Sequence, residues 1–209
     1  DPQKEKESSL KDYFVPLTTL KAVHFIVIIG IIVFFNSLFN SFVFDDNAQI
    51  VNNPVVHSLA YIPVFFAGGS FFDPANNQII GMFYRPIVSI VYSLIFAVSG
   101  TQPFLFHLFQ LLLHSVNAIL VFILFRKFFN PLLSLFLAII FLIHPINQEA
   151  VAYISNLQES LFFFFGMLAL FLSINKAQSV WRIVFISIFF LLGLLSKETV
   201  ILFLPILFL

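Results

Sequence analysis

Residues 22–44 read AVHFIVIIGIIVFFNSLFNSFVF, a stretch without a single Asp, Glu, Lys or Arg. A helix rises about 1.5 Å per residue, so this stretch is long enough to cross a hydrocarbon core about 30 Å thick. A cleaved signal peptide explains it less well, because the run is long and no small-residue cleavage motif follows it. The stretch therefore predicts a transmembrane helix.

The composition of the whole chain agrees with this. Of the 209 residues 60% are hydrophobic and 10% are charged, and the mean hydropathy is +1.04. Soluble domains carry roughly a quarter charged residues, so we expect the lipid bilayer to be the solvent of this protein. Lys and Arg balance Asp and Glu, so no basic excess indicates nucleic acid as a partner. Cysteine is absent, which excludes disulfides, thiolate metal sites and a cysteine nucleophile.

Further apolar segments follow the first and predict an all-α fold, a polytopic transmembrane helical bundle. The segments are 86–100, 104–125, 131–143, 160–174, 181–195 and 200–209. Residues 1–21 are polar and are predicted to form a cytoplasmic tail, which leaves 22–209 as the membrane domain. The chain starts without methionine and stops inside an apolar run. We therefore expect it to be the N-terminal part of a longer protein.

Positive charges predict the orientation of these segments. Lys and Arg favour the cytoplasmic side, which would place there the N-terminal lysines, Arg126 with Lys127, and Lys176 with Arg182. These assignments agree with one another only if 86–100 does not cross the membrane. That segment has 15 residues, begins with proline and ends with Ser-Gly, so it is short for a span. We expect a re-entrant or juxtamembrane helix there.

The remaining connections would then lie on the non-cytoplasmic side. They are the loops 45–85 and 144–159 and the turn 196–198. The first is too long for a simple linker and contains turn signals such as Asn52-Asn53-Pro54 with short amphipathic pieces between them. It predicts juxtamembrane helices in this external loop. No alternation typical of strands is visible.

Asp45 and Asp46 follow the first predicted span at the membrane boundary. Two adjacent carboxylates repel each other, so one of them could act as a base, or a divalent metal ion could bind between them. The simpler interpretation is an acidic helix end or a turn with Asn47. Both interpretations stay open on the residues alone.

Other charged or titratable residues stand at the predicted external ends of spans. Arg85 could hold a phosphate bidentately or extend to lipid headgroups. His144 and Glu149 could bind a metal, an acceptor or a donor, although His-Pro is also an ordinary helix end. Lys197 and Glu198 interrupt a long apolar stretch and indicate either a contact to a donor phosphate or a polar turn between two spans.

A polar stripe runs along the predicted helix 104–125. His107, Gln110, His114 and Asn117 are spaced by three, four and three residues, which places them on one face. That face must contact protein rather than lipid. The spacing favours interhelical hydrogen bonds over catalysis.

Several motifs follow one another in a characteristic order. They are Phe44-Asp45-Asp46 with Ile50-Val51-Asn52-Asn53-Pro54, Tyr84-Arg85-Pro86, Phe106-His107-Leu108 with Leu111-Leu112-Leu113-His114, His144-Pro145 with Glu149-Ala150-Val151-Ala152-Tyr153, and Leu195-Ser196-Lys197-Glu198-Thr199. The ordered set resembles the transmembrane and tetratricopeptide-repeat containing O-mannosyltransferases and their bacterial relatives, within the GT-C membrane glycosyltransferases. It covers most of the chain after the first span. One departure is Leu157-Gln158-Glu159, where the family tends to have an Arg before the acidic residue.

The resemblance implies a GT-C-like helical core and a polyprenyl- or dolichyl-phosphate-linked sugar as donor. The acceptor would be a protein, a lipid or a glycan. The resemblance carries the catalytic acidic pair onto Asp45 and Asp46, with a divalent metal as a further candidate there. The other positions of the pattern would bind donor or acceptor, and they are Arg85, His144, Glu149, Lys197 and Glu198.

From these residues we predict a membrane enzyme that moves a mannose-like hexose to an acceptor hydroxyl with inversion. It would lie among the lipids of a bacterial cytoplasmic membrane or of an endoplasmic reticulum membrane, with its site on the non-cytoplasmic side. A transporter or lipid flippase is the main alternative, because polar groups on membrane helices also mark substrate paths. An anchoring segment without activity is the second alternative.

Overall fold

The computed structural model describes residues 17–73, 76, 78–81, 83–174 and 179–207. Within these residues most of the chain is helical, and the prediction of an all-α membrane bundle is confirmed. The α-helices are α2 Thr19–Phe34, α3 Pro86–Ser99, α4 Pro103–Phe125, α5 Pro131–Ile143, α6 Gln148–Ala152, α7 Leu157–Ser173, α8 Val180–Leu194 and α9 Leu204–Leu207. Short 3-10 or π-helical turns are η1 Phe35–Phe39, η2 Asn47–Val51, η3 Leu59–Phe66, η4 Pro145–Asn147, η5 Ile154–Asn156 and η6 Glu198–Phe203.

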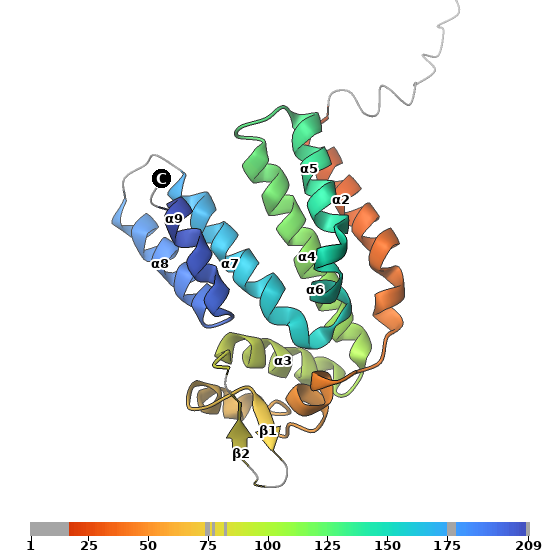
Figure 1. The fold of residues 1–209 in the computed structure, drawn as a ribbon, viewed down its shortest axis with the longest axis vertical. Coiled ribbons are helices and arrows are strands. Elements are labelled where there is room, and N and C mark those ends of the chain that lie inside the picture. Colours follow the sequence, from red (N-terminus) through yellow and green to blue (C-terminus); the bar gives the residue numbers. More distant parts are fainter. Residues whose placement is uncertain (1–16, 74–75, 77, 82, 175–178, 208–209) are drawn as a thin grey trace, which may run out of the picture.

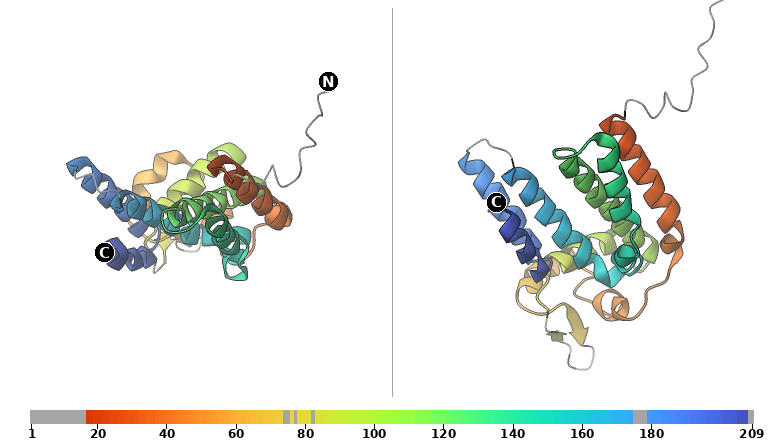
Figure 2. Two further views of the ribbon diagram at one scale, coloured as in Figure 1. Left: turned by 90° about the horizontal axis from the view of Figure 1, so that it is seen from above. Right: turned by 45° about the horizontal axis from the view of Figure 1, so that its top comes forward.

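The long helices form two neighbouring groups (Figures 1 and 2). Helices α2, α4 and α5 pack against one another, and α7 packs with α8 and α9. The groups meet where α7 contacts α4. Helix α3 lies across one end of the molecule and touches both α4 and α7. This agrees with the prediction that 86–100 does not cross the membrane.

Prolines and caps explain where the helices begin. Pro86, Pro103 and Pro131 each occupy the first turn of a helix, where a missing N–H is harmless and the fixed φ suits the helix. The Asn130 side chain accepts a hydrogen bond from a backbone N–H in the first turn of α5. Gly100, with φ of +57°, ends α3. The sequence signals for these boundaries therefore act locally.

The first span differs from its prediction at both ends. Helix α2 begins at Thr19, and its 3-10 continuation ends at Phe39 rather than at Phe44. The Ser37 hydroxyl donates to the carbonyl of Phe34, and the Asn40 N–H donates to the carbonyl of Ser37. Because these bonds tighten the last turn, the helix ends early. The acidic pair is therefore separated from the span by a short non-helical stretch.

Within the described residues three helices are long and apolar enough to span a membrane, namely Thr19–Phe39, Pro103–Phe125 and Ile154–Ser173. Helix α5 and the following 145–152 form a pair bent by 49° that would make a fourth. Many large apolar side chains are exposed on α2, α5 and α8. Water disfavours such surfaces and lipid does not, so the fold is that of a multi-pass membrane protein.

The polar connections gather at one end of the bundle. The loops after α2 and α5 and the turn after α8 lie beside α3, while the turn between α4 and α5 lies at the other end (Figure 1). There Arg126 Nη1 donates to Thr19 Oγ1 at 2.6 Å. The described residues that were predicted to share one side of the membrane therefore do so, whereas Lys176 lies outside the described residues. Which side this is stays a prediction.

The loop 45–85 contains the expected short helices, η2 Asn47–Val51 and η3 Leu59–Phe66. It also contains two antiparallel strands that were not predicted, β1 Phe71–Asp73 and β2 Gln78–Ile80, with Phe71 opposite Ile80. Three residues are too few to show a visible alternation. Gly69 passes so close to β2 that a Cβ would lie 2.4 Å from the Ile80 carbonyl oxygen. A glycine is therefore required there.

Candidate active site

Asp46 is fully buried, and both of its carboxylate oxygens accept hydrogen bonds. Oδ1 accepts from the N–H and the hydroxyl of Ser155 at 2.8 and 2.5 Å, and Oδ2 accepts from the N–H of Val43 at 2.9 Å. Hydrogen bonds to an ionised acceptor are among the strong ones. Asp46 thus connects the loop after the first span to η5, more than a hundred residues further along the chain.

Asp45 is exposed, although it directly precedes Asp46. Its carboxylate makes no hydrogen bond or ion pair within the described residues, while its N–H donates to the Tyr153 hydroxyl at 3.2 Å. Phe44 has a φ of +45°, the one positive φ outside glycine in the described part of the chain. Such a backbone costs free energy and persists where neighbouring contacts fix it. The bonds from Asp46 to Val43 and Ser155 fix this turn, which buries one carboxylate and leaves the other in solvent.

Two tyrosine hydroxyls lie around the acidic pair. Burial raises the pKa of Tyr153, and the charges of Asp45 and Asp46 raise it further against the opposing hydrogen bonds. Burial likewise raises the pKa of Tyr92 well above its usual value, with Asp46 adding to the effect and Arg85 opposing it. Both hydroxyls are therefore neutral at physiological pH and act as hydrogen-bonding groups.

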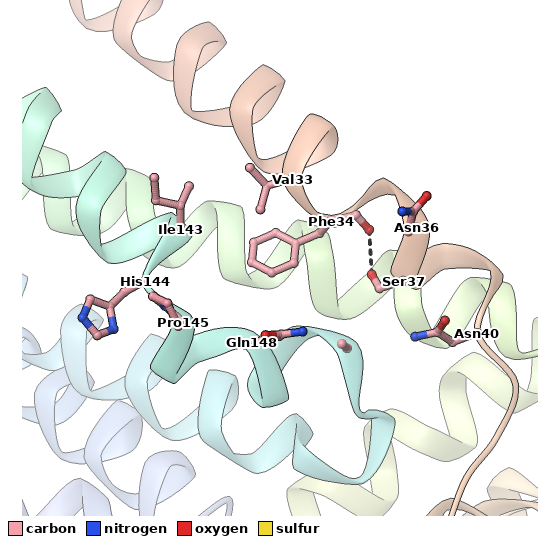
Figure 3. A pocket seen from close by; sticks show the side chains of 10 residues that line it. Val33, Phe34, Asn36, Ser37, Asn40, Ile143, His144, Pro145 and Gln148 are labelled. Carbon is pink, nitrogen blue, oxygen red and sulfur yellow. Dashed lines mark hydrogen bonds between the residues drawn. The ribbon is translucent and has the colours of Figure 1, made fainter.

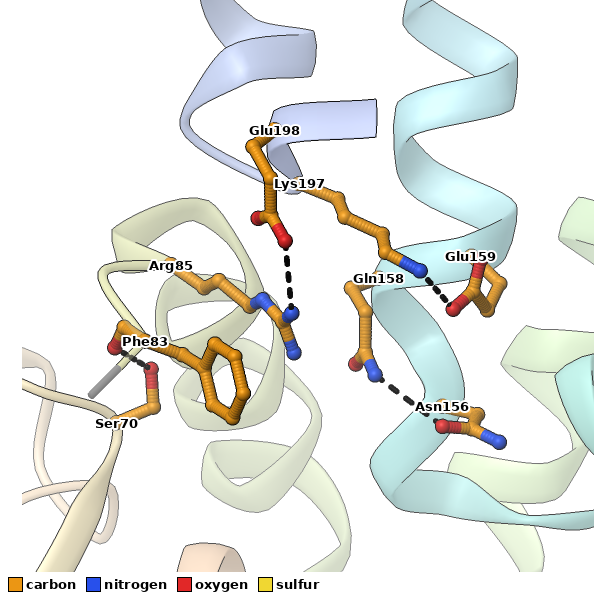
Figure 4. Close-up of polar contacts among 8 residues, drawn as sticks. All are labelled: Ser70, Phe83, Arg85, Asn156, Gln158, Glu159, Lys197 and Glu198. Atoms are coloured by element: carbon orange, nitrogen blue, oxygen red, sulfur yellow. Dashed lines mark hydrogen bonds and ion pairs between the residues drawn. The ribbon is translucent and has the colours of Figure 1, made fainter. Parts of the chain in front are cut away.

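Two cations lie near each other at the polar end of the bundle (Figure 4). The Arg85 guanidinium is 14% exposed, lies 4.4 Å from the centre of the Phe83 ring, and approaches Glu198 with Nη2 3.7 Å from Oε1. Its Nε is buried without a hydrogen-bond partner. The Lys197 ammonium forms an ion pair with Glu159. Glu198 is 69% exposed, so its long contact to Arg85 is easily exchanged for another anion.

Backbone contacts bring these distant residues together. The Ile87 N–H at the start of α3 donates to the Leu195 carbonyl at the end of α8, at 3.3 Å. The Tyr92 hydroxyl donates to the Ile154 carbonyl at 2.8 Å. These hydrogen bonds between distant parts of the chain, rather than closeness in the sequence, hold the segments that carry Arg85 and Lys197 near η5.

Glu149 lies at the edge of this arrangement. Its Oε2 accepts from Asn156 Nδ2 at 3.5 Å, and the Asn156 side chain also accepts from Gln158 Nε2 at 3.2 Å. Gln158 and Asn156 lie close to Arg85 and Lys197 in Figure 4. Glu149 is thus joined through the Asn156 side chain to Gln158, which lies near the cations.

His144 lies in a different place. Its Nδ1 accepts from the Ile146 N–H at 3.2 Å and caps η4, as expected for a helix end. The residue lines a pocket of about 400 Å³ between η1 and α6, with Gln148 and Asn40 on either side of the pocket (Figure 3). The structure therefore does not bring His144 together with Arg85 or Lys197.

The polar stripe of α4 is structural. The side chains of Gln110, His114 and Asn117 each hydrogen-bond a backbone carbonyl of another element at 2.9 to 3.1 Å. The prediction of interhelical hydrogen bonding is confirmed for these three. His107 is buried, and neither of its ring nitrogens has a hydrogen-bond partner in the described residues. One bond from Gln110 goes to the Tyr153 carbonyl at 2.9 Å, so the stripe supports the acidic pair indirectly.

The expected metal does not fit the acidic pair well. Both oxygens of Asp46 already accept hydrogen bonds from protein groups. Within the described residues no three His, Cys, Asp or Glu side chains form a group that could hold an ion. Asp45 alone would offer one carboxylate, whereas divalent ions take several oxygen ligands. The residues of the acidic pair therefore fit a divalent ion poorly.

Sequence reasoning missed several residues of this site. Tyr153 belonged to a quoted motif without being assigned a role, and Glu159 was noted only as part of a departure. The sequence did not identify Tyr92 or Ser155 as site residues, because a tyrosine and a serine at a helix end are common. Their importance comes from contacts across more than sixty and one hundred residues, respectively.

Comparisons with known proteins agree with the motifs. No family model matches the chain and no solved structure matches it. The chain is 29% identical over 187 residues to the Protein O-mannosyl-transferase TMTC3 of Mus musculus. These aligned residues cover 85% of the chain and 20% of that protein. It is 27% identical to the human TMTC3 over 188 residues, which covers 86% of the chain and 20% of the relative. The Protein O-mannosyl-transferase F38B6.6 of Caenorhabditis elegans is 28% identical over 87% of the chain and 26% of its own length.

The chain spans about a fifth of the length of the curated relatives it matches first. The resemblance predicted from the sequence is thus confirmed, and over most of its length this chain is a relative of the protein O-mannosyl-transferases.

Proposed function

We propose that the protein is a membrane glycosyltransferase that moves a mannose-like hexose from a polyprenyl-phosphate donor to an acceptor hydroxyl on the non-cytoplasmic side. The observation that carries the proposal is that the exposed carboxylate of Asp45 and two cations, Arg85 and Lys197, lie at the same polar end of a membrane bundle. Asp46 bonds Ser155 of η5 there, and the cations lie near Asn156 of η5 (Figure 4). The names of the relatives support the reaction class.

The two carboxylates of the acidic pair take different roles in this proposal. Asp45 is exposed and has no hydrogen-bond partner on its carboxylate, so it is the general base that receives the proton of the acceptor hydroxyl. Asp46 is a positioning residue, because its three hydrogen bonds hold the turn on which Asp45 lies. Tyr153 supports the same turn through the Asp45 N–H.

The cations serve the departing phosphate. The acceptor oxygen forms a bond to the anomeric carbon while the bond from that carbon to the phosphate oxygen breaks, which inverts the centre. The electron pair leaves with the lipid phosphate, and preorganised cations stabilise this developing charge. Arg85 offers a planar pair of donors and Lys197 a point charge. The phosphate replaces Glu198 at Arg85, because Glu198 is exposed and its contact is long.

The transporter alternative is less well supported by the arrangement. Transporters place substrate groups near the midplane of the membrane, whereas here the segments that carry Asp45, Arg85 and Lys197 lie at one end of the bundle (Figure 1). The polar groups deeper in α4 bond to backbone carbonyls. These bonds hold the stripe to neighbouring elements.

The test measures sugar release and transfer from radiolabelled polyprenyl-phosphate mannose, and from the glucose donor, by the whole protein in detergent. Asp45→Asn should lower the rate by about two to four orders of magnitude, the range of general base catalysis. Asp73→Asn is the control, because Asp73 is a carboxylate of the same loop at the strand pair. A chelator is added to each sample to test for a metal. Full activity in Asp45→Asn would contradict the proposal, and no reaction with either donor would favour transport.

A further inference from the structure

We propose that the turn between α4 and α5 binds the phosphate of an acidic phospholipid, at the end of the bundle opposite the polar end. The turn comprises residues 126–130, with the sequence Arg-Lys-Phe-Phe-Asn. Arg126 directly follows α4, which is long and apolar enough to span a membrane, and lipid headgroups lie where a span ends. The inference does not depend on the proposed function and is the same for either side of the membrane.

The described charges are separated between the two ends of the bundle. Arg126 and Lys127 belong to the α4–α5 turn, and Lys21 and Arg182 lie in the first turns of α2 and α8 at the same end (Figure 1). The described carboxylates all belong to the segments 45–85, 144–159 and 196–198. They are Asp45, Asp46, Asp73, Glu149, Glu159 and Glu198. Within the part of the chain that the structure describes, the end with the α4–α5 turn therefore carries cations and no carboxylate.

Neighbouring helices hold both cations of the turn in place. Arg126 Nη1 donates to Thr19 Oγ1 at the start of α2, at 2.6 Å, and the guanidinium lies 5.8 Å from the centre of the Phe122 ring. The Lys127 ammonium lies 4.5 Å from the centre of the Phe171 ring in α7. The turn therefore contacts both groups of helices, and its cations are preorganised against the protein surface.

Both cations keep donors for an anion. A guanidinium has five N–H donors and an ammonium has three. Among the described residues, Arg126 uses one donor on Thr19, and Lys127 makes no hydrogen bond or ion pair. Two adjacent positive charges also repel each other, so an anion that contacts both relieves the repulsion. The planar donors of Arg126 beside the point charge of Lys127 suit the oxygens of a phosphate.

Apolar side chains around the turn indicate that this phosphate belongs to a lipid. Phe128 is 67% exposed, and Leu132 at the start of α5 is 72% exposed. Trp181, next to Arg182 at the same end, is also exposed. Aromatic side chains beside cations are typical of the headgroup region, where acyl chains cover the apolar surface. A soluble phosphate compound would leave this surface in water.

The experiment uses the whole protein in a neutral detergent and phosphatidylglycerol with a fluorescent label on one acyl chain. Phosphatidylcholine with the same chains and label is the lipid without net charge. Arg126→Gln with Lys127→Gln removes both cations of the turn. Lys21→Gln with Arg182→Gln is the matched control, because it removes the same charge from the same end at other positions. Arg126→Lys with Lys127→Arg keeps both charges in the turn.

Phosphatidylglycerol should bind to wild type and to the charge-keeping variant with similar affinity. Loss of both cations of the turn should weaken this binding by roughly thirtyfold, since each cation near a headgroup contributes about a five- to sixfold gain. The control double variant should lose less than about threefold. Equal losses in the two double variants would show a diffuse positive field instead of a site, and would overturn the proposal.

Two measurements on wild type need no variant. Phosphatidylglycerol should raise the unfolding temperature more than phosphatidylcholine does, because the bound headgroup stabilises the folded state. Glycerol 3-phosphate at the same concentration should not displace the labelled lipid. Equal unfolding temperatures with the two lipids, or displacement by the soluble headgroup alone, would overturn the assignment to a phospholipid.

Discussion

The polar stripe of α4 and the polar end of the bundle use similar residues in opposite ways. In the stripe, Gln110, His114 and Asn117 each bond a backbone carbonyl of another element. At the polar end, Asp45 has a carboxylate without such a partner, and Arg85 contacts Glu198 only at 3.7 Å. The stripe thus bonds the helix to its neighbours, although His107 and the amide oxygens of Gln110 and Asn117 are buried without a partner in the described residues. The polar end keeps charged groups that can bind something else.

The difference teaches that bonds from side chains to the backbone of another element mark the structural polar residues of this membrane protein. A polar group in contact with lipid or apolar protein must find a partner, so the stripe stabilises helix packing. Groups at the end of the bundle contact water and need no partner. The acidic pair contains both situations in two adjacent residues.

The largest expected effect on stability concerns Asp46. Asp46→Ala leaves the buried donors of Ser155 and the partly buried N–H of Val43 without an acceptor, so the free energy of unfolding should fall by about 3 kcal/mol. Thermal unfolding in detergent measures this, with Asp45→Ala as the control that should unfold as wild type does. Equal unfolding temperatures for Asp46→Ala and wild type would show that the buried Asp46 contributes no more to stability than the exposed Asp45.

Arg85→Ala should weaken donor binding. Charge-assisted hydrogen bonds to a phosphate contribute enough that the KM for the donor should rise by about ten- to a hundredfold. Arg85→Lys should recover part of this, because it keeps the charge and loses the planar pair of donors. Titration of the polyprenyl-phosphate mannose donor gives these values. If the KM for the donor stayed constant while the KM for the acceptor rose, Arg85 would bind the acceptor instead of the donor.

A smaller effect is expected within the stripe. Asn117→Leu removes the bond to the Ser160 carbonyl and should lower the free energy of unfolding by about 1 kcal/mol. The rate per folded molecule should stay the same, because the Asn117 side chain bonds a backbone carbonyl and not a charged group of the site. A loss of rate without a loss of stability would mean that the stripe also takes part in the reaction.

Glu198→Gln should have the smallest effect. It removes the anion that competes with the donor phosphate at Arg85, so the donor KM should fall by about twofold, and less at high salt. The matched change Glu149→Gln lies beyond two amide side chains and should leave the donor KM constant. A higher KM in Glu198→Gln would mean that Glu198 itself binds the donor.

The fold could be predicted because lipid makes local rules sufficient. Apolar runs of the right length, with proline at their start, predicted α4 and α5 to within one residue. The first span ends earlier than predicted because the Ser37 hydroxyl bonds the Phe34 carbonyl. Such local side-chain bonds to the backbone are weak competitors of helix formation, so the hydropathy pattern does not show them. The strand pair escaped prediction because it is held by one close backbone approach at Gly69.

The sequence by itself determined the membrane bundle, the one polar end and the residue types available there, because hydropathy and charge act on each segment separately. Only the tertiary structure decided which carboxylate of the acidic pair is exposed, that Ser155 and Tyr153 hold their turn, and that His144 faces a separate pocket. The reason is physical: these choices depend on hydrogen bonds between groups far apart in the chain, and such pairings leave no periodic signal along it.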